Sequence, residues 1–223
     1  MTWVKICGTT TLHDAQLSVA AGADALGFIF APSPRRVDPK DAAGIVAALP
    51  RGIESIGVFV NETPVRVAEV VKQVGLSGVQ LHGGETADEA VELRQALGGC
   101  RIFKTFHANE LADNFQLKLE AFLSHLNDID GILLDSGSNQ QRGGTGVPFS
   151  WDETLPAAIA IRAKFPLIIA GGLTAENVGR AAELFQPWGI DVVSAVESAP
   201  GKKDETKLRD FIAAVRRAQL STV

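Results

Sequence analysis

The sequence predicts an α/β protein with the (β/α)8 barrel fold, formed as a single domain by residues 1–223. Short apolar runs alternate with longer stretches of helical periodicity along the whole chain, a pattern typical of a parallel sheet. Eight such units divide the chain into segments of about 28 residues, each long enough for a strand, a helix and two short loops. An open doubly wound sheet is the alternative, but the GxGxxG segment that usually follows its first strand is missing.

The expected strands are short and mostly continuous apolar runs. Such runs suit strands that are covered by helices on one side and packed into a barrel interior on the other. In chain order they are residues 4–6, 25–30, 55–60, 78–81, 101–105, 131–135, 167–170 and 191–196.

Capping signals indicate where helices begin. Asp38-Pro39 and Thr63-Pro64 place a capping side chain before a proline at the first helical position, and Thr174 precedes Asn177 by three residues. Apolar residues at helical spacing over 65–74 and 87–97 predict faces that cover the barrel. Residues 136–146 form a long, polar, glycine-rich segment, and a loop of that length in a compact domain is usually functional.

The composition excludes several classes of function. With 46% hydrophobic residues, the chain can bury a core without a disulfide or a structural metal. A net charge of −5 argues against a nucleic-acid partner, because phosphate contacts require a cationic face. No run without Asp, Glu, Lys or Arg exceeds 12 residues, against the ~20 apolar residues of a membrane-spanning helix. No signal peptide is visible, so we expect a cytoplasmic location and no membrane partner. The sequence does not determine the oligomeric state, and a monomer is compatible with it.

The potential metal ligands show no recognisable motif. Cys7 and Cys100 are too few and too far apart in sequence for a disulfide scaffold or a zinc site. The histidines also lack ligand spacing, so we expect neither a metal nor a cofactor; they are His13, His82, His107 and His125.

The barrel geometry sorts polar residues between its two ends. Groups that follow the carboxyl ends of strands converge on one mouth, where barrel enzymes carry out their chemistry. This rule places at the mouth Cys7, Arg35, Arg36, His82 and Asp135. In contrast, we expect Cys100 and Asp191 at the opposite end, because each stands where a predicted strand begins.

Cys7 and Asp135 are candidates for a base and an acid. A cysteine in this position can be a small buried hydrophobe, but a thiol facing a cleft can also act as a thiolate. An aspartate after a strand often forms a turn, whereas a desolvated carboxyl favours the protonated form that a general acid requires.

Glycine-rich or small-residue segments follow the last three strands. They are GGTG at 143–146, AGGL at 170–173 and SAVES at 194–198. Backbone amides at such loop ends can bind an anion, and barrels frequently hold a phosphate after strands seven and eight.

Three further residues at the mouth each allow two interpretations. Arg35 and Arg36 could be solvated charges, but the arginine fork suits a carboxylate or a phosphate, and Pro32 and Pro34 stiffen the loop. His82 is either a structural histidine or a substrate contact.

In their order along the chain, these motifs resemble the phosphoribosylanthranilate isomerase family. The resemblance runs nearly end to end and rests on VKICGTT, GADALGFIF with SPRRV, GVFVN, VQLHGGE, LLDS, GGTG, AGGLTAENV and DVVSAVESAPGKKD. It implies an isomerase of tryptophan biosynthesis that needs no cofactor. The implied reaction is the Amadori rearrangement of N-(5-phosphoribosyl)anthranilate to 1-(2-carboxyphenylamino)-1-deoxyribulose 5-phosphate.

The resemblance also implies roles for individual residues. By position, Cys7 is the general base, Asp135 the general acid, and Arg36 the partner of the substrate's aromatic carboxylate. The phosphate of this small substrate would lie on backbone amides of Gly144, Gly172, Ser194, Ala195 and Val196. Val193 and Ala195 depart from the family's serine-rich turn with glycine, and alanine adopts a positive φ less readily than glycine.

Three alternatives remain open. One is a histidine-pathway isomerase barrel, although its bisphosphate substrate would favour anion loops in both halves of the chain. Another is a non-catalytic barrel that binds a phosphorylated metabolite, which would not need both Cys7 and Asp135. The third is a redox-sensing role for Cys7, which the absence of a nearby resolving cysteine disfavours.

Overall fold

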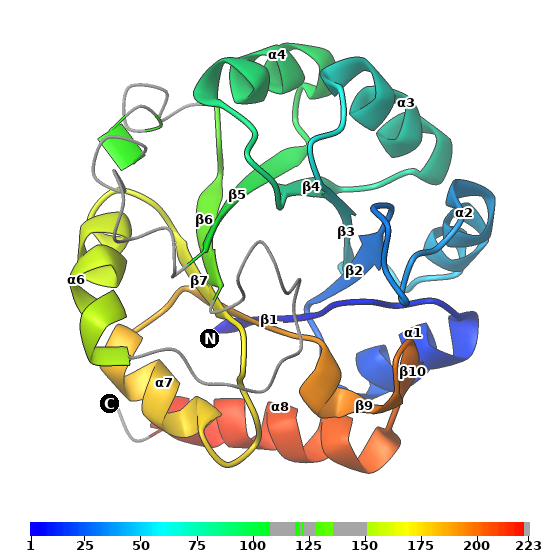
Figure 1. Ribbon diagram of the computed structural model, residues 1–223. Coiled ribbons are helices and arrows are strands. Elements are labelled where there is room, and N and C mark those ends of the chain that lie inside the picture. Colours follow the sequence, from blue (N-terminus) through cyan, green and yellow to red (C-terminus); the bar gives the residue numbers. More distant parts are fainter. Residues whose placement is uncertain (108–118, 121, 123–127, 136–150, 221–223) are drawn as a thin grey trace.

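The computed structural model describes residues 1–107, 119, 120, 122, 128–135 and 151–220. Eight parallel strands close into a barrel in the order β1 to β8, with β8 paired to β1. Helices surround this barrel as an outer ring (Figure 1). The predicted (β/α)8 barrel is therefore confirmed.

All of the predicted strands are present. They are β1 (Trp3–Ile6), β2 (Ala25–Ile29), β3 (Glu54–Phe59), β4 (Gly78–Leu81), β5 (Arg101–His107), β6 (Gly131–Asp135), β7 (Leu167–Ala170) and β8 (Gly189–Val192). The largest difference concerns β8, which begins two residues earlier than predicted. Residues Ser194–Val196, expected as its last part, form a 3-10 turn labelled η2.

The described helices are α1 (Leu12–Ala21), α2 (Pro39–Ala47), α3 (Pro64–Val74), α4 (Ala87–Leu97), α6 (Trp151–Arg162), α7 (Val178–Phe185) and α8 (Glu205–Leu220). The side chains of Asp38 and Thr63 cap α2 and α3, as predicted. The expectation that Thr174 caps a helix is wrong. The side chain of Asn177 instead bonds the amide of Thr174 and the carbonyl of Gly172, closing a turn after which α7 begins.

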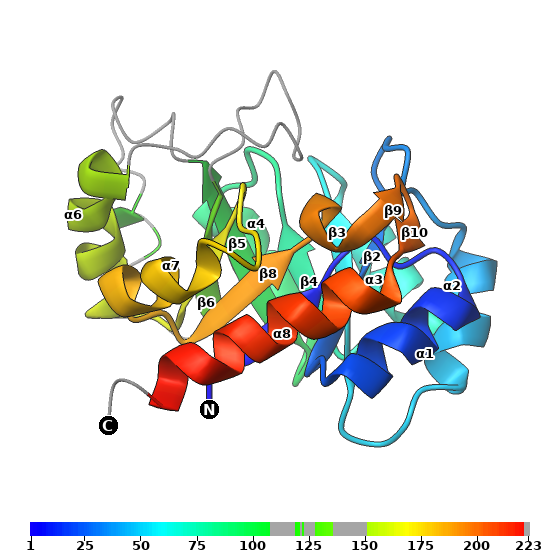
Figure 2. The same cartoon turned by 90° about the horizontal axis from the view of Figure 1, so that it is seen from below.

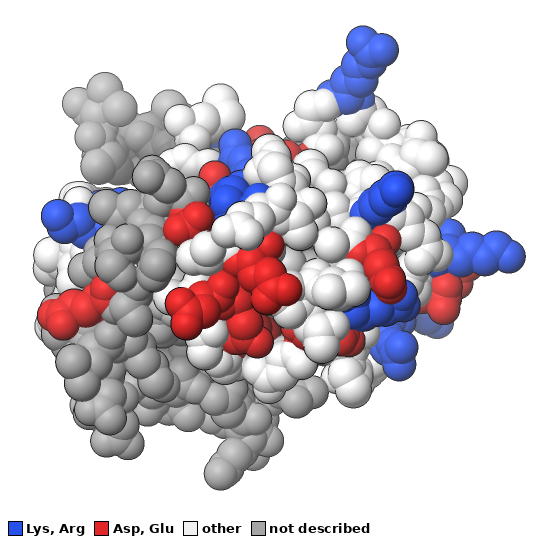
Figure 3. Space-filling model, turned by 90° about the horizontal axis from the view of Figure 1, so that it is seen from above, with Lys and Arg blue, Asp and Glu red and all other residues white. Residues whose placement is uncertain are grey.

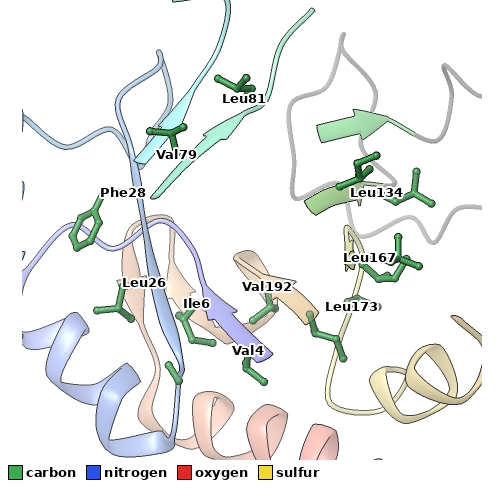
Figure 4. Packing of buried hydrophobic residues seen from close by; sticks show 14 of the residues in the cluster. Val4, Ile6, Leu26, Phe28, Val79, Leu81, Leu134, Leu167, Leu173 and Val192 are labelled. Carbon is green, nitrogen blue, oxygen red and sulfur yellow. The ribbon is translucent and has the colours of Figure 1, made fainter. Parts of the chain in front are cut away.

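Alternate residues of each strand face opposite sides of the barrel wall. One set packs outward against the helices, and Figure 4 shows some of these side chains, including Val4 and Ile6 of β1. The other set fills the interior with a separate apolar cluster: Trp3, Ala25, Ile56, Phe103, Leu133, Ile168 and Ala170. The interior positions that continue this alternation toward the mouth are polar and form the site described below.

A short hairpin follows β8 and η2. Its strands are β9 (Glu197–Ala199) and β10 (Lys202–Lys203), which pair antiparallel. In the side view of Figure 2, β8 points toward the end of the barrel where this hairpin lies, opposite the end marked by the N-terminus. The hairpin therefore belongs to the mouth, and it brings Glu197 and Lys203 there.

The surface carries charges of both signs. Figure 3 shows acidic side chains gathered near the middle of one face and basic side chains mostly toward its right-hand side. Within the described ranges, no helix combines the length and the apolar character needed to cross a membrane.

Candidate active site

A cavity of about 140 Å³ lies at the carboxyl ends of the strands, where the sequence predicts the site. Its lining includes Cys7 after β1, His82 after β4 and Asp135 at the end of β6. The fold thus brings together three of the predicted mouth residues, although they are far apart in the chain.

The Cys7 thiol is enclosed and faces the barrel interior. The residue is 3% exposed, and a Cβ added to Gly27 of β2 would lie 2.5 Å from Sγ, so the thiol packs directly on this glycine. Burial raises the pKa of the Cys7 thiol above its usual value, while the charges of Lys5 and Lys203 oppose that rise. A thiol in this position needs a nearby cation in order to act as a thiolate.

His82 stands beside Asp135 across the cavity. The distance from His82 Nε2 to Asp135 Oδ2 is 3.7 Å. His82 Nδ1 lies 2.9 Å from the side-chain amide nitrogen of Gln80 and 3.1 Å from the hydroxyl of Thr105. Burial, together with the charges of His107, Lys5 and Lys104, lowers the pKa of His82 to about 3. The pair is therefore a neutral imidazole beside a carboxyl group.

We expect His82 to remain neutral throughout the physiological pH range. Between its folded pKa of about 3 and the ordinary value of 6.5, the unfolded chain binds more protons than the folded chain. The contribution of His82 to stability is therefore complete above pH 6.5 and is lost as the pH falls toward 3. Imidazole NMR signals, assigned with His82→Gln, should show no titration of His82 between pH 5 and pH 8; a midpoint near 6.5 would contradict this environment.

The mouth also gathers a group of possible metal ligands that the sequence spacing did not reveal. His82, His107 and Asp135 each offer a ligand atom, and these atoms lie within 4.8 Å of one another. They come from three adjacent strands, so no local motif could indicate them. The expectation of no metal remains a prediction.

A second, smaller pocket lies beside the first, at the ends of β7 and β8. Asp135, Asp191 and Val193 line both pockets and so form the wall between them. Residues 170–173 and 192–195 form most of the lining of the smaller pocket. The predicted phosphate residues Gly172, Ser194 and Ala195 therefore lie together.

The departures at Val193 and Ala195 fit this geometry. Gly171 and Gly172 have φ values of +82° and +62°, in the region that favours glycine. Among the described residues other than glycine, positive φ occurs only at Asn61 and Gln186. Ala195, in η2, therefore needs no glycine-like backbone, and Val196 behind it is buried. Gly144, the remaining predicted phosphate residue, lies outside the described residues.

The two arginines have different surroundings. Arg35 lines the cavity with Cys7, but its guanidinium donates to Glu197 through Nε and Nη2, with Nη2 at 2.8 Å from Oε2. Arg36 lines a neighbouring pocket of about 350 Å³, which shares Ala31, Pro32 and Val60 with the Cys7 cavity. Arg35 is thus committed to a structural ion pair, and Arg36 faces a separate compartment next to the catalytic cavity.

The expected position of Asp191 is wrong. Asp191 is the third of the four residues of β8, pairs in register with Lys5 and lines both mouth pockets. The error came from starting the eighth strand at Asp191 rather than at Gly189. Cys100, in contrast, directly precedes β5 at the amino end of the barrel, where burial raises its pKa to about 11.

Several site residues escaped sequence reasoning. Lys5, Gln80, His107 and Asp191 all lie in strands that were predicted, or in the extension of one, on the same side as the interior residues. Period-two alternation read backward from the mouth would have indicated them, since Lys5 precedes Cys7 by two residues and Gln80 precedes His82 by two.

Comparisons with known proteins agree with this geometry. The family model described as "PRAI: N-(5'phosphoribosyl)anthranilate (PRA) isomerase" matches residues 4–214. A relative of that name from Geobacter sulfurreducens is 43% identical over 222 residues, covering 98% of this chain and 99% of the relative. The solved phosphoribosyl anthranilate isomerase of Thermotoga maritima is 36% identical, with a TM-score of 0.82 over 97% of this chain and 100% of the other.

A further solved structure contains a ligand. It is a phosphoribosyl anthranilate isomerase in complex with reduced 1-(o-carboxyphenylamino)-1-deoxyribulose 5-phosphate. That chain is 35% identical to this one, with a TM-score of 0.79, and the match covers 97% of this chain and 100% of the other.

The fold, the paired mouth pockets and these matches define a (β/α)8 barrel isomerase that acts on a small phosphorylated molecule. More particularly, the chain belongs to the N-(5'-phosphoribosyl)anthranilate isomerase family and is an enzyme of tryptophan biosynthesis.

Proposed function

We propose that Cys7 and Asp135 are the general base and the general acid of the family's Amadori rearrangement. The substrate is N-(5'-phosphoribosyl)anthranilate and the product is 1-(2-carboxyphenylamino)-1-deoxyribulose 5-phosphate. The observation that carries this assignment is that Cys7 and Asp135, from β1 and β6, line one cavity at the mouth. A substrate held between them can receive a proton from Asp135 at its ring oxygen and lose a proton to Cys7 from a sugar carbon.

The reaction requires two proton transfers of opposite sense. Asp135 donates a proton to the furanose ring oxygen, and the C–O bond breaks to give a Schiff base with the anthranilate nitrogen. The Cys7 thiolate then removes the proton from the sugar carbon next to the imine, and the electron pair moves to the nitrogen. The resulting enolamine tautomerises to the keto product.

The phosphate occupies the smaller pocket in this proposal. Gly172, Ser194 and Ala195 line this pocket, and their backbone amides, with that of Val196, support the phosphate because amide groups at strand ends favour an anion. Gly144, which follows β6 in the sequence, is a further proposed partner of the phosphate. Arg36 binds the aromatic carboxylate from its own pocket, and His82 contacts the sugar from the wall of the Cys7 cavity.

The isomerase activity itself has a direct test. N-(5'-phosphoribosyl)anthranilate is generated in place, and the decay of its fluorescence is followed after the purified protein is added. We expect decay proportional to protein concentration. No decay at high protein concentration would exclude the proposed reaction.

We also propose that the protein is cytoplasmic and monomeric. Size-exclusion chromatography measures the oligomeric state.

Substitutions at Ala195 test whether the phosphate binds to the backbone of η2. We expect Ala195→Gly to leave competition by inorganic phosphate unchanged and to lower stability by ~0.5–1 kcal/mol, through added chain entropy. Ala195→Asp should raise the phosphate inhibition constant by roughly tenfold or more, because a carboxylate would stand beside the anion in a partly desolvated pocket. Unchanged inhibition in the aspartate variant would place the phosphate elsewhere.

Arg36→Lys tests the proposed carboxylate fork. Lysine keeps the charge but loses bidentate geometry, so we expect KM to rise by roughly tenfold with little change in kcat. Arg66 is the matched control, because it lines the same pocket; Arg66→Lys should leave KM unchanged. An equal rise in KM in both variants would mean that Arg36 provides no specific carboxylate fork. Arg35→Lys should mainly lower stability, since Arg35 holds Glu197.

A further inference from the structure

An ion pair lies inside the barrel, directly below the catalytic cavity. Lys5 Nζ is 2.7 Å from Asp191 Oδ1, and the two side chains are only 1% and 6% exposed. The interior layer beneath is apolar, with Trp3, Phe103 and Ile168. Two charges withdrawn from water cost desolvation free energy that apolar residues of similar size would avoid. Stability alone therefore gives no reason for this pair.

The position of the pair suggests a reason. Lys5 precedes Cys7 by two residues, so both face the interior from the same strand, and Asp191 of β8 is the register partner of Lys5. The charges of Lys5 and Cys7 interact across this interior face, and each favours the ionised form of the other. Burial lowers the pKa of Lys5, but Asp191 and Cys7 outweigh this and hold it above its usual value. Lys5 therefore stays an ammonium beside the thiol.

The other cations near Cys7 are engaged elsewhere. The charged and titratable groups that face Cys7 or share its cavity are Lys5, Arg35, His82, Asp135, Asp191 and Lys203. Arg35 donates to Glu197 through Nε and Nη2, and His82 is neutral. Lys203 Nζ donates to the backbone carbonyl of Cys7 at 2.5 Å and to Glu197 at 3.1 Å. It therefore fixes the Cys7 backbone, whereas Lys5 shares the interior side of the first strand with the Cys7 side chain.

We propose that Lys5 is a positioning residue for the isomerisation: its ammonium, anchored by Asp191, is the counter-ion of the Cys7 thiolate. The proposal rests on the role of Cys7 as the base. In the step it serves, the thiolate takes the proton from the sugar carbon and becomes a thiol, while Lys5 keeps its own protons. Asp191 holds the ammonium in place but also competes with the sulfur for it.

The test measures the ionisation of Cys7 separately from catalysis. In a Cys100→Ser background, Cys7 is the only thiol, and its alkylation rate by iodoacetamide is followed against pH. We expect Lys5→Met to raise the midpoint by at least one pH unit, which slows alkylation about tenfold at a pH below the midpoint. kcat should fall with it and recover at higher pH, while KM stays nearly constant.

Asp191→Asn should shift the Cys7 alkylation midpoint in the opposite direction. It keeps the ammonium and removes its competitor, so we expect the Cys7 midpoint to fall rather than rise. Damage to the fold would instead change both variants in the same direction. Lys104→Met is the matched control, because Lys104 forms another buried pair, with Glu85, at the same distance of 2.7 Å; it should leave the midpoint unchanged.

The outcomes separate this proposal from the proposed function. An unchanged midpoint in Lys5→Met overturns the role of Lys5, even if activity falls. If Lys5→Met does not fold, Asp191→Asn decides: a lower midpoint supports the proposal, and an equal or higher midpoint overturns it. Because alkylation needs no substrate, a failure of the isomerase assay leaves this result intact.

Discussion

Cys7→Ala should lower kcat by roughly 10²- to 10⁴-fold, the contribution expected of one general base. The substitution removes the sulfur that packs on Gly27 and lines the cavity, while the backbone of Cys7 remains held by Lys203. Because the space left behind adjoins an existing cavity, thermal unfolding should change little. Single-turnover kinetics with substrate generated in place measure the effect.

The second thiol provides the control for Cys7. Cys100 is half-buried at the amino end of the barrel, and its Sγ lies 3.9 Å from the carbonyl oxygen of Leu76. Cys100→Ala should therefore keep full turnover. Near-normal turnover in Cys7→Ala would refute the base assignment.

Asp135→Asn should produce a loss of similar size, roughly 10²- to 10⁴-fold in kcat, because the amide cannot deliver a proton to the ring oxygen. Asparagine keeps the shape of the side chain beside His82 and in the wall between the two pockets. The folded structure should persist, as measured by circular dichroism and thermal unfolding.

Asp130 offers a matched control at the other end of the same strand. Its carboxylate binds Arg94 and accepts from the amide of Ile102 at 2.8 Å, away from both mouth pockets. Asp130→Asn should lower stability and leave turnover unchanged. The account would be wrong about the acid if Asp130→Asn reduced turnover as strongly as Asp135→Asn.

Much of the fold was predictable because the signals are local. Each buried strand is an apolar run, and the caps at Asp38 and Thr63 are read from adjacent residues. The Asn177 turn was missed because the sequence is compatible with two arrangements. Thr174 could cap the helix with its side chain, or Asn177 could bond Thr174 and Gly172, as it does in the structure.

The site was predictable only in part, for a geometric reason. Cys7, His82 and Asp135 were found because they follow strand ends, which the barrel rule sends to one mouth. Asp191 was misplaced because an error in the start of one strand exchanged the two ends of the barrel for that residue. The pairing of Lys5 with Asp191 depends on the closure of β8 onto β1, a contact between the two ends of the chain that no local pattern encodes.

A crystal structure of this chain with reduced 1-(o-carboxyphenylamino)-1-deoxyribulose 5-phosphate, the compound bound in a solved relative, tests the assignment of Cys7 and Asp135 most directly. We expect the phosphate against Gly172 and η2, and the aromatic carboxylate at Arg36. The sugar carbon next to the nitrogen-bearing carbon should lie ~3–3.5 Å from the Cys7 sulfur, with Asp135 on the other side of the sugar. A ligand whose phosphate occupies the Arg36 pocket, or whose sugar lies out of reach of Cys7 and Asp135, would contradict this assignment.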